Sequence, residues 1–202
     1  MTLIPPPEET HLESKNPLRD ILKQISSFFY GIVGQVPEHA IKGLTDFLAR
    51  LVRGAPLSRF SRVTPQLYVS GQHRKHGMKT LAKWGITGTV NMRSEYDDAA
   101  AGIAASRHVN LSTEDNTAPT MDELRRGITF IEQEIEAGGK VYIHCAAGLG
   151  RAPTMAAAYL VSTGLSPQQA WDKIRAVRPF IRPTPEQIEL VDRLANEQNA
   201  LT

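Results

Sequence analysis

The sequence predicts an α/β fold in which a mostly parallel central sheet is wrapped by helices and preceded by an N-terminal helical extension. Three observations predict it. Short runs rich in β-branched residues alternate with longer amphipathic stretches between residues 60 and 200. One run, residues 141–143, leads through a loop with two glycines into a helix start at Pro153. Two further amphipathic stretches lie ahead of the first expected strand.

The length and composition limit the domain organisation. The 202 residues are enough for one folded domain with an extension. We predict a disordered segment over residues 1–17, a helical extension over 18–56 and one domain over 60–200. The formal net charge of +2 gives no indication of a nucleic-acid partner. The single cysteine excludes an internal disulfide and a cysteine-rich zinc site, and it fits a reducing compartment such as the cytoplasm.

No targeting or membrane-spanning segment is expected. Residues 1–17 are rich in proline and acidic side chains and lack the basic region and apolar core of a secretory signal. The longest uncharged run, residues 24–37, is shorter than the roughly 20 apolar residues of a spanning helix.

Two amphipathic helices are expected in the extension. The first covers residues 18–33, and the second follows Pro37 and ends before Pro56. The apolar residues of the second are Ile41, Leu44, Phe47, Leu48, Leu51 and Val52. Packing on the following domain or on each other is the simplest way to cover these faces. The alternative is a peripheral membrane contact or self-association through residues 18–53, where bulky aromatic residues stand beside basic ones.

The elements expected between residues 57 and 112 are short. Residues 63–69 predict an edge strand or hairpin, because Pro65 interrupts them. The following elements are, in order, a solvated turn at 71–77, a helix at 78–84, a strand at 86–92, an alanine-rich helix ending near Ser106, and a strand at 107–111. A basic rim is the alternative for the turn, which contains His73, Arg74, Lys75 and His76.

Capping residues mark the helices of the second half. Thr120 and Glu123 form a capping box, and Ser166 and Thr184 begin two further helices. The nearly all-apolar stretch 152–163 predicts a buried helix. In such a fold the ligand is expected at the carboxyl end of the strand that precedes this helix.

The loop at that position is the most informative stretch of the chain. It is spelled His144-Cys145-Ala146-Ala147-Gly148-Leu149-Gly150-Arg151. A loop whose successive N–H groups turn inward and which leads into a helix N-terminus binds a tetrahedral oxyanion such as phosphate. The same dipoles favour the thiolate of Cys145, and Arg151 offers a planar fork of donors for two phosphoryl oxygens. The alternative is an inert buried thiol.

The pattern Cys-x5-Arg with a preceding histidine resembles the signature loop of the cysteine-based phosphatases, and the chain is similar to their dual-specificity branch. The resemblance implies a phosphomonoester hydrolase that works through a cysteinyl-phosphate intermediate, without a metal or other cofactor. The implied substrates are phosphotyrosine, phosphoserine or phosphothreonine proteins, or a non-protein phosphomonoester. Rhodanese-like sulfurtransferases fit the arginine spacing less well, and a non-catalytic phosphate-binding module is a further alternative.

The resemblance also implies roles within the loop. Cys145 is the nucleophile, Arg151 holds the phosphoryl group, and His144 orders the loop and tunes the thiolate. The phosphate-binding residues are Ala146, Ala147, Gly148, Leu149, Gly150 and Arg151. Ala152 departs from the usual serine or threonine, so we expect slower breakdown of the phosphoenzyme. The glucan phosphatases share HC-x-A-G-x-G-R-A-P, so this alanine does not argue against activity.

The leaving alkoxide or phenoxide requires a proton donor. The polar loop 112–119 carries two candidates, Glu114 and Asp115, and the residues alone leave both open. In the dual-specificity family the general acid is an aspartate on this loop about 30 residues before the cysteine, which matches Asp115. The resemblance therefore implies Asp115.

Two sub-family resemblances bear on the substrate. The loop is most like that of the glucan phosphatases. Residues 94–96, 111–115, 119–120 and 156–160 look like the phosphatidylglycerophosphate phosphatase branch. A phospholipid of the phosphatidylglycerophosphate or phosphoinositide type, or a phosphoglucan, is therefore the alternative substrate. Three arginines are expected either as a basic rim for an acidic head group or as solvated surface: Arg93, Arg178 and Arg182.

Overall fold

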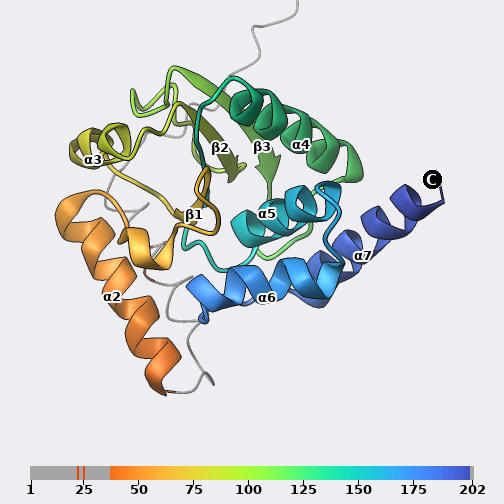
Figure 1. Ribbon diagram of the computed structural model, residues 1–202. Coiled ribbons are helices and arrows are strands. Elements are labelled where there is room, and N and C mark those ends of the chain that lie inside the picture. The colour runs from red at the N-terminus through yellow and green to blue at the C-terminus, as the bar shows by residue number, and fades with distance from the viewer. Residues whose placement is uncertain (1–21, 23–24, 26–36, 201–202) are drawn as a thin grey trace, which may run out of the picture.

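The computed structural model describes Leu22, Ile25 and residues 37–200 (Figure 1). The segment expected to be disordered, residues 1–17, and nearly all of the first amphipathic stretch, residues 18–33, lie outside the described residues. Within the described part, no helix combines the length and the apolar character needed to cross a bilayer.

Four parallel strands form the sheet. They are β1 (Leu67–Gly71), β2 (Gly88–Arg93), β3 (Arg107–Thr113) and β4 (Val141–Cys145), in the spatial order β1-β4-β2-β3. All three neighbouring pairs are parallel, and every residue of β1, β2 and β4 is buried. Strands that are covered on both faces have no solvent-facing side, so β1 and β4 are largely apolar and do not alternate with exposed polar residues. In β2 the buried positions also include Thr89, Asn91 and Arg93. The predicted α/β fold with a mostly parallel sheet is confirmed.

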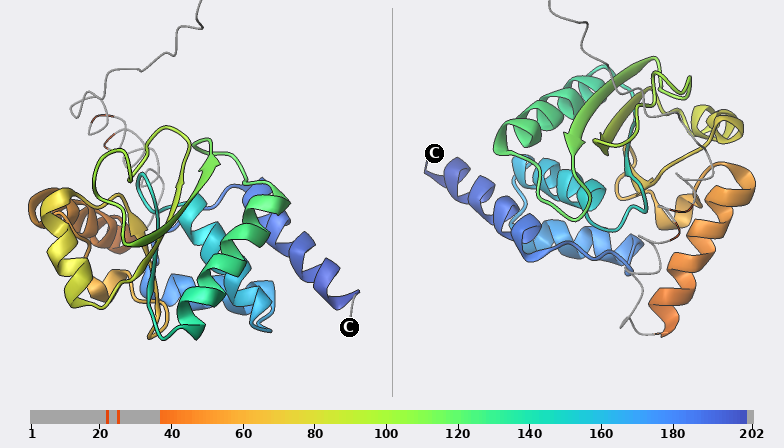
Figure 2. Two further views of the ribbon diagram at one scale, coloured as in Figure 1. Left: turned by 90° about the horizontal axis from the view of Figure 1, so that it is seen from above. Right: turned by 180° about the vertical axis from the view of Figure 1, so that it is seen from behind.

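Helices lie on both sides of the sheet (Figures 1 and 2). They are α2 (Pro37–Arg53), α3 (Met78–Lys83), α4 (Met121–Glu136), α5 (Arg151–Ser162), α6 (Pro167–Val177) and α7 (Pro185–Asn199), with short 3-10 turns η1 (Ser58–Phe60) and η2 (Lys75–Gly77). The main core lies between the sheet and helices α4 to α7, and a smaller cluster packs Leu81 of α3 against Tyr68 and Tyr142.

The second half follows the expected elements closely. The capping box of Thr120 and Glu123 is present, and equivalent caps at Ser166 and Thr184 begin α6 and α7. Helix α5 is buried at nearly every residue, because α4, α6 and α7 pack around it. This surrounded position explains its almost wholly apolar sequence.

Two expectations between β1 and β3 are wrong. The alanine-rich stretch is not a helix: Asp97 accepts hydrogen bonds from the backbone N–H groups of Ala99 and Ala100, and Gly102 ends the turn with a φ of 67°. The expected solvated turn at 71–77 is in part buried, since His73 is only 1% exposed. Both segments instead line the interior beside β4.

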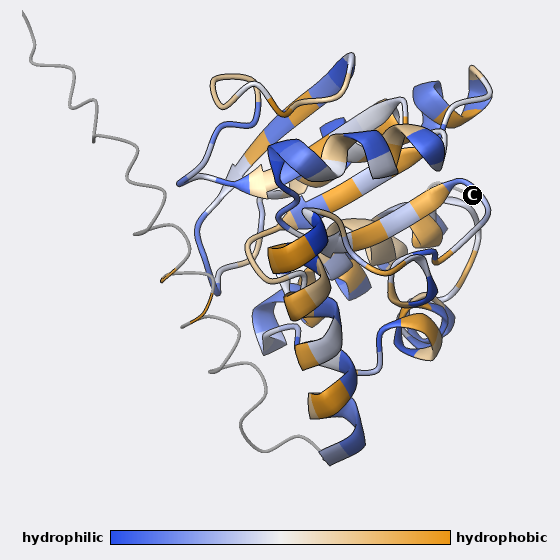
Figure 3. Cartoon of the chain, turned by 90° about the vertical axis from the view of Figure 1, so that its left-hand side faces the viewer, coloured by the Kyte–Doolittle hydropathy of each residue, from blue (hydrophilic) through white to orange (hydrophobic). Residues whose placement is uncertain are grey.

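Helix α2 is oriented opposite to the expectation. It buries Gly43, Asp46, Phe47 and Arg50, and its exposed large hydrophobic residues are Ile41, Leu44, Leu48, Leu51 and Val52. Figure 3, which views the side of the molecule on which α2 lies, shows hydrophobic segments recurring along this helix. The expected packing of this apolar face on the following domain is therefore wrong for these five residues, whereas Phe47 is buried as expected. The other expectation, packing on the first amphipathic stretch, lies outside the described residues. Asp46 and Arg50 of α2 are buried because they form ion pairs and hydrogen bonds beneath the loop that follows β4.

Candidate active site

The loop between β4 and α5 has the geometry of an anion-binding nest. Cys145 ends β4 and is 3% exposed, and the N–H of Gly148 donates to its Sγ at 3.3 Å. Gly148 has a φ of 75°, and a Cβ there would lie 2.3 Å from the backbone carbon of Ser70. Only glycine therefore fits this turn. Helix α5 begins directly afterwards, at Arg151.

The carbonyl groups of the loop are held from outside by two buried arginines. Arg50 of α2 lies 3.4 Å from the carbonyl oxygens of Ala146 and Ala147, and Arg178 donates to the carbonyl oxygen of Gly148 at 3.2 Å. Because a peptide group places its N–H opposite its C=O, carbonyls held outside leave the following amides facing the thiol side.

Asp46 of α2 joins these two arginines. Its Oδ2 lies 3.4 Å from Arg50 Nε and 3.4 Å from Arg178 Nη1, and it accepts a hydrogen bond from Ser70 Oγ at 3.1 Å. The three charged residues are between 0 and 2% exposed. Two guanidinium groups against one carboxylate leave one net positive charge beneath the loop, which favours a bound anion.

The fork of Arg151 is fixed by Glu95 and Thr113. Its Nη1 and Nη2 lie 3.0 and 3.1 Å from the two carboxylate oxygens of Glu95, and Nη1 donates to the carbonyl oxygen of Thr113 at 2.8 Å. Burial alone would raise the pKa of Glu95, but the hydrogen bond and charge of Arg151 lower it to about 2. Burial would lower the pKa of Arg151, but the nearby Cys145 and Glu95 raise it above its ordinary value.

Asp115 lies at the same guanidinium. Its Oδ1 is 2.9 Å from Arg151 Nη2, and its side chain is 42% exposed. The loop is held by Gln187 at the start of α7, whose Nε2 donates to the carbonyl oxygen of Thr117 at 2.7 Å, and Asn116 adopts a positive φ of 62°. The other candidate, Glu114, is exposed. The structure thus brings Asp115 to Arg151.

His144 is buried behind the nucleophile and pairs with a carboxylate. Its Nε2 lies 2.6 Å from Asp98 Oδ2, and Asp98 Oδ1 accepts from Gln72 Nε2 at 3.0 Å. Burial would raise the pKa of Asp98, but the charge and hydrogen bond of His144 lower it to about 2. Burial and His144 together lower the pKa of the neighbouring His73 to about 4, so that ring is neutral near pH 7.

These contacts form one continuous network, which is buried except at Glu95. Gln72 Oε1 accepts from Arg93 Nη1 at 2.9 Å, and Arg93 Nε lies 2.9 Å from Glu95 Oε1. His144, next to the thiol, is therefore connected to Arg151 through Asp98, Gln72, Arg93 and Glu95. The two ends of the signature loop are positioned by the same set of side chains.

Three members of this region have the composition of a metal site: His73, Asp98 and His144 offer ligand atoms within 4.8 Å of one another. In this arrangement His144 Nε2 and Asp98 Oδ2 use each other as hydrogen-bond partners, and His73 Nε2 uses the carbonyl oxygen of Ile103 at 2.8 Å. One ring nitrogen of each histidine is thus hydrogen-bonded, whereas His73 Nδ1 and His144 Nδ1 are buried without a hydrogen-bond partner among the described residues. Catalysis without a metal stays a prediction.

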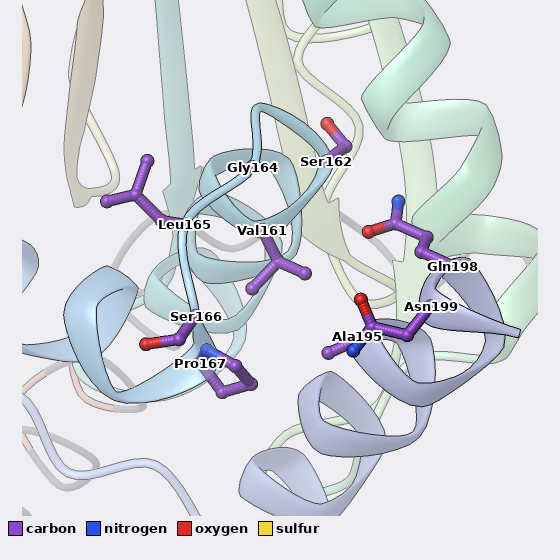
Figure 4. Close-up of a pocket in the computed structure, with 9 residues that line it drawn as sticks. All are labelled: Val161, Ser162, Gly164, Leu165, Ser166, Pro167, Ala195, Gln198 and Asn199. Carbon is purple, nitrogen blue, oxygen red and sulfur yellow. The ribbon is translucent and has the colours of Figure 1, made fainter. Parts of the chain in front are cut away.

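A pocket of about 600 Å³ lies at the other end of α5. Figure 4 shows it between Gly164, Leu165, the start of α6 and the last turns of α7. None of its lining residues is ionisable. It therefore offers no ionisable group for acid or base chemistry. Its two hydroxyl groups take part in local hydrogen bonds, since Ser162 Oγ donates to the carbonyl oxygen of Tyr159 and Ser166 Oγ accepts from the N–H of Gln169.

A model of the family described as "Dual specificity phosphatase, catalytic domain" matches residues 67–196. The chain belongs to the dual specificity phosphatase family. The matched range contains the strands, the signature loop and Asp115, whereas α2, with Asp46 and Arg50, lies outside it.

The individual proteins that the chain resembles have different names. The chain is 33% identical to the Rattus norvegicus "Phosphatidylglycerophosphatase and protein-tyrosine phosphatase 1" over 121 residues, which are 55% of this chain and 63% of that protein. It is 30% identical to Homo sapiens dual specificity protein phosphatase 5, over 60% of this chain and 32% of that protein. The crystal structure of PTPMT1 in complex with PI(5)P aligns with a TM-score of 0.65 and 26% identity, covering 69% of this chain and 96% of that chain.

Two of the three arginines expected at a basic rim are interior residues. Arg93 and Arg178 are fully buried and hold the active-site network and the loop carbonyls, so both expectations for them are wrong. Arg182 is exposed, and its backbone N–H donates to the carbonyl oxygen of Leu149 at 2.7 Å. Ala152 is fully buried in the first turn of α5, and its methyl group supplies no hydrogen-bond donor.

Five polar residues of the site were not predicted: Asp46, Arg50, Gln72, Glu95 and Asp98. A signal existed for Glu95 and Asp98, since they follow the carboxyl end of a buried strand, where open α/β sheets bind ligands. Asp46 and Arg50 form an i, i+4 pair on an amphipathic helix, a pattern typical of a solvated face. Nothing in that pattern points to burial.

Proposed function

We propose that this dual specificity phosphatase domain hydrolyses phosphomonoesters through a cysteinyl-phosphate intermediate on Cys145. The observation that carries the proposal is the convergence of three groups on one loop: the thiol, the fork of Arg151 and the carboxylate of Asp115. A domain that only bound phosphate would have no use for a carboxylic acid beside the anion site.

The proposed reaction has two steps. The Cys145 thiolate attacks phosphorus in line with the leaving oxygen, the P–O bond breaks, and Asp115 gives its proton to the departing alkoxide or phenoxide. A water molecule then attacks the phosphocysteine while Asp115 takes its proton, which releases phosphate and restores the thiolate. The loop amides and Arg151 bind the three non-bridging oxygens in both steps, and this positioning supplies most of the rate acceleration. The phosphoryl group replaces Asp115 at Arg151 Nη2, which frees that carboxyl group to act at the leaving oxygen.

Residues behind the loop set its charge. Arg50 and Arg178 add one net positive charge through their shared partner Asp46, and His144 orders the loop next to Cys145 with Asp98 as its anionic partner. Glu95 prevents the guanidinium of Arg151 from rotating away between turnovers. We therefore include α2 in the catalytic unit together with residues 60–200.

We propose phosphotyrosine, phosphoserine or phosphothreonine proteins, or a non-protein phosphomonoester, as substrates. A phospholipid monoester is the second candidate, because two similar proteins have names or titles that include a phosphatidylglycerophosphatase and PI(5)P. We also propose work in a reducing compartment such as the cytoplasm, since Cys145 is the chain's one cysteine and no second thiol can restore it after oxidation.

Hydrolysis of p-nitrophenyl phosphate tests the proposed reaction. We expect the wild type to turn over and Cys145→Ser to be inactive while still binding vanadate. A wild type that binds vanadate without hydrolysis would make the domain a phosphate-binding module. A panel of phosphopeptide, phospholipid and phosphoglucan monoesters would then order the substrates by kcat/KM.

A further inference from the structure

Helix α2 presents an apolar stripe to solvent. The stripe consists of Ile41, Leu44, Leu48, Leu51 and Val52, which are between 37 and 75% exposed. Among the described residues, these five and Leu22 are the exposed large hydrophobic side chains. Exposed apolar residues gathered on one element indicate a surface that binds something.

Helix α2 is attached to the rest of the domain by residues that are not part of this stripe. Phe47 is buried, and Asp46 and Arg50 are used beneath the signature loop. The helix is therefore anchored by one face and exposes the other. The sequence predicts, as one alternative, a membrane or self-association contact within residues 18–53. Among the described residues of that range, the apolar side chains of α2 available for such a contact are these five.

The chain beyond α2 is strongly basic. Of the 23 lysine and arginine residues, nine lie between residues 47 and 94, whereas none of the 21 acidic residues does. Seven of the nine are not used inside the active site, and six of these are exposed: Arg53, Arg59, Arg62, Lys75, Lys79 and Lys83. They belong to the end of α2 and to η1, η2, α3 and the turn after η1.

These basic elements lie around α2. The N–H of Arg74 donates to the carbonyl oxygen of Gly54 at 2.8 Å, and Gly77 packs directly on Gly54, which fixes η2 against the end of the helix. Helix α3 follows η2 without a break, and Figure 1 places α2 and α3 on the same side of the molecule. The stripe therefore has cations beside it and no acidic residue in the segment that follows it.

We propose that α2 docks this protein on an anionic lipid bilayer. The stripe enters the boundary between head groups and acyl chains, and the basic residues of α2, η1, η2 and α3 bind the anionic head groups. An exposed apolar stripe beside several cations is the composition of helices that lie in the membrane interface. A neutral protein groove would match the stripe but leave the cations unused. The surface uses no residue of the signature loop, so the proposal stands apart from the proposed reaction.

Vesicle co-sedimentation with the full chain tests the proposal. The probes are vesicles of phosphatidylcholine alone and of phosphatidylcholine mixed with phosphatidylglycerol. We expect partition onto the anionic vesicles that falls with salt, because cations near the surface are screened. Ile41→Ser with Leu48→Ser should lower the partition coefficient at least about ten-fold, since two apolar side chains no longer enter the bilayer.

Charge variants distinguish binding by the basic residues near α2 from an effect of the net charge of the whole protein. Lys79→Glu with Lys83→Glu on α3 should lower anionic partition about ten-fold or more. The matched control, Arg126→Glu with Arg193→Glu on α4 and α7, makes the same change of net charge away from α2 and should leave partition nearly unchanged. Hydrolysis of p-nitrophenyl phosphate in solution serves as the fold check and should stay at the wild-type rate in all three variants.

Four results would overturn the proposal. The wild type could fail to sediment with anionic vesicles, or the α3 and control variants could lose partition equally. Sedimentation velocity could show a dimer that the stripe variant dissociates, which would make a second copy the occupant. A large drop of Tm in the stripe variant would instead identify residues 18–33 as the cover. A soluble and active but non-binding protein would refute only the docking proposal.

Discussion

Replacing Arg50 tests whether α2 positions the signature loop. The variant Arg50→Met keeps most of the side-chain volume and removes the guanidinium that lies 3.4 Å from the carbonyl oxygens of Ala146 and Ala147. Loss of one member of a buried ion pair costs about 3–5 kcal/mol, and because Asp46 keeps Arg178 as a partner we expect the lower end, about 3 kcal/mol. For a chain of this size that corresponds to a Tm lowered by roughly 6–12 °C.

The rate should fall as well as the stability. A loop that relaxes by a fraction of an ångström points its amides less accurately at the phosphoryl oxygens, so kcat/KM for p-nitrophenyl phosphate should drop about ten- to hundred-fold well below the new Tm. Arg50→Lys restores a charge without the fork and should recover stability more than rate. Arg53→Met, exposed at the end of the same helix, is the matched control and should change neither. A destabilised Arg50→Met with wild-type kcat/KM would refute the positioning argument.

Four other changes have definite expected outcomes. Asp115→Asn should cut kcat while vanadate affinity stays near the wild-type value, and Glu114→Gln should have little effect; equal losses would leave the acid unassigned. Glu95, whose pKa is held at about 2 instead of 4.5, contributes stability above pH 4.5 that disappears as the pH falls toward 2, so urea denaturation of Glu95→Gln should show less acid sensitivity than the wild type. Asp98→Asn removes the anionic partner of His144 and should lower kcat/KM for p-nitrophenyl phosphate because the loop beside Cys145 is less firmly held, whereas an unchanged kcat/KM would separate Asp98 from the loop. Ala152→Ser adds a hydroxyl beside the departing thiolate and should raise kcat in steady-state assays; a fall would show that phosphoenzyme breakdown does not limit the rate.

Local signals determined the part of the fold that sequence could predict. Thr120, Ser166 and Thr184 cap their helices with adjacent residues, so their role can be recognised within four positions of the chain. The failure at residues 97–106 has the opposite origin. Alanine favours a helix, but Asp97 and Gly102 form a turn that leaves Asp98 beside His144, a partner 46 residues away.

The site divides in the same way. Cys145, Arg151 and the loop between them are contiguous, and their spacing alone indicates an anion site. Glu95 has a local signal, its place after the carboxyl end of a buried strand, but its contact with Arg151 depends on the pairing of β2 with β4, which no local pattern reveals. Asp46 and Arg50 are the extreme case. An i, i+4 ion pair has the same sequence pattern whether it is solvated or buried, and this pair is buried because Arg50 contacts the carbonyl oxygen of Ala146, 96 residues later in the chain.

The ionisation of Cys145 is the claim on which the other assignments depend, and it can be measured directly. Because the chain has one cysteine, the rate of alkylation by iodoacetate reports on that sulfur alone. The account predicts rapid alkylation already below neutral pH and protection by vanadate, which would occupy the same loop. Alkylation that rises only above about pH 8, as for an ordinary thiol, and that vanadate leaves unchanged would contradict it.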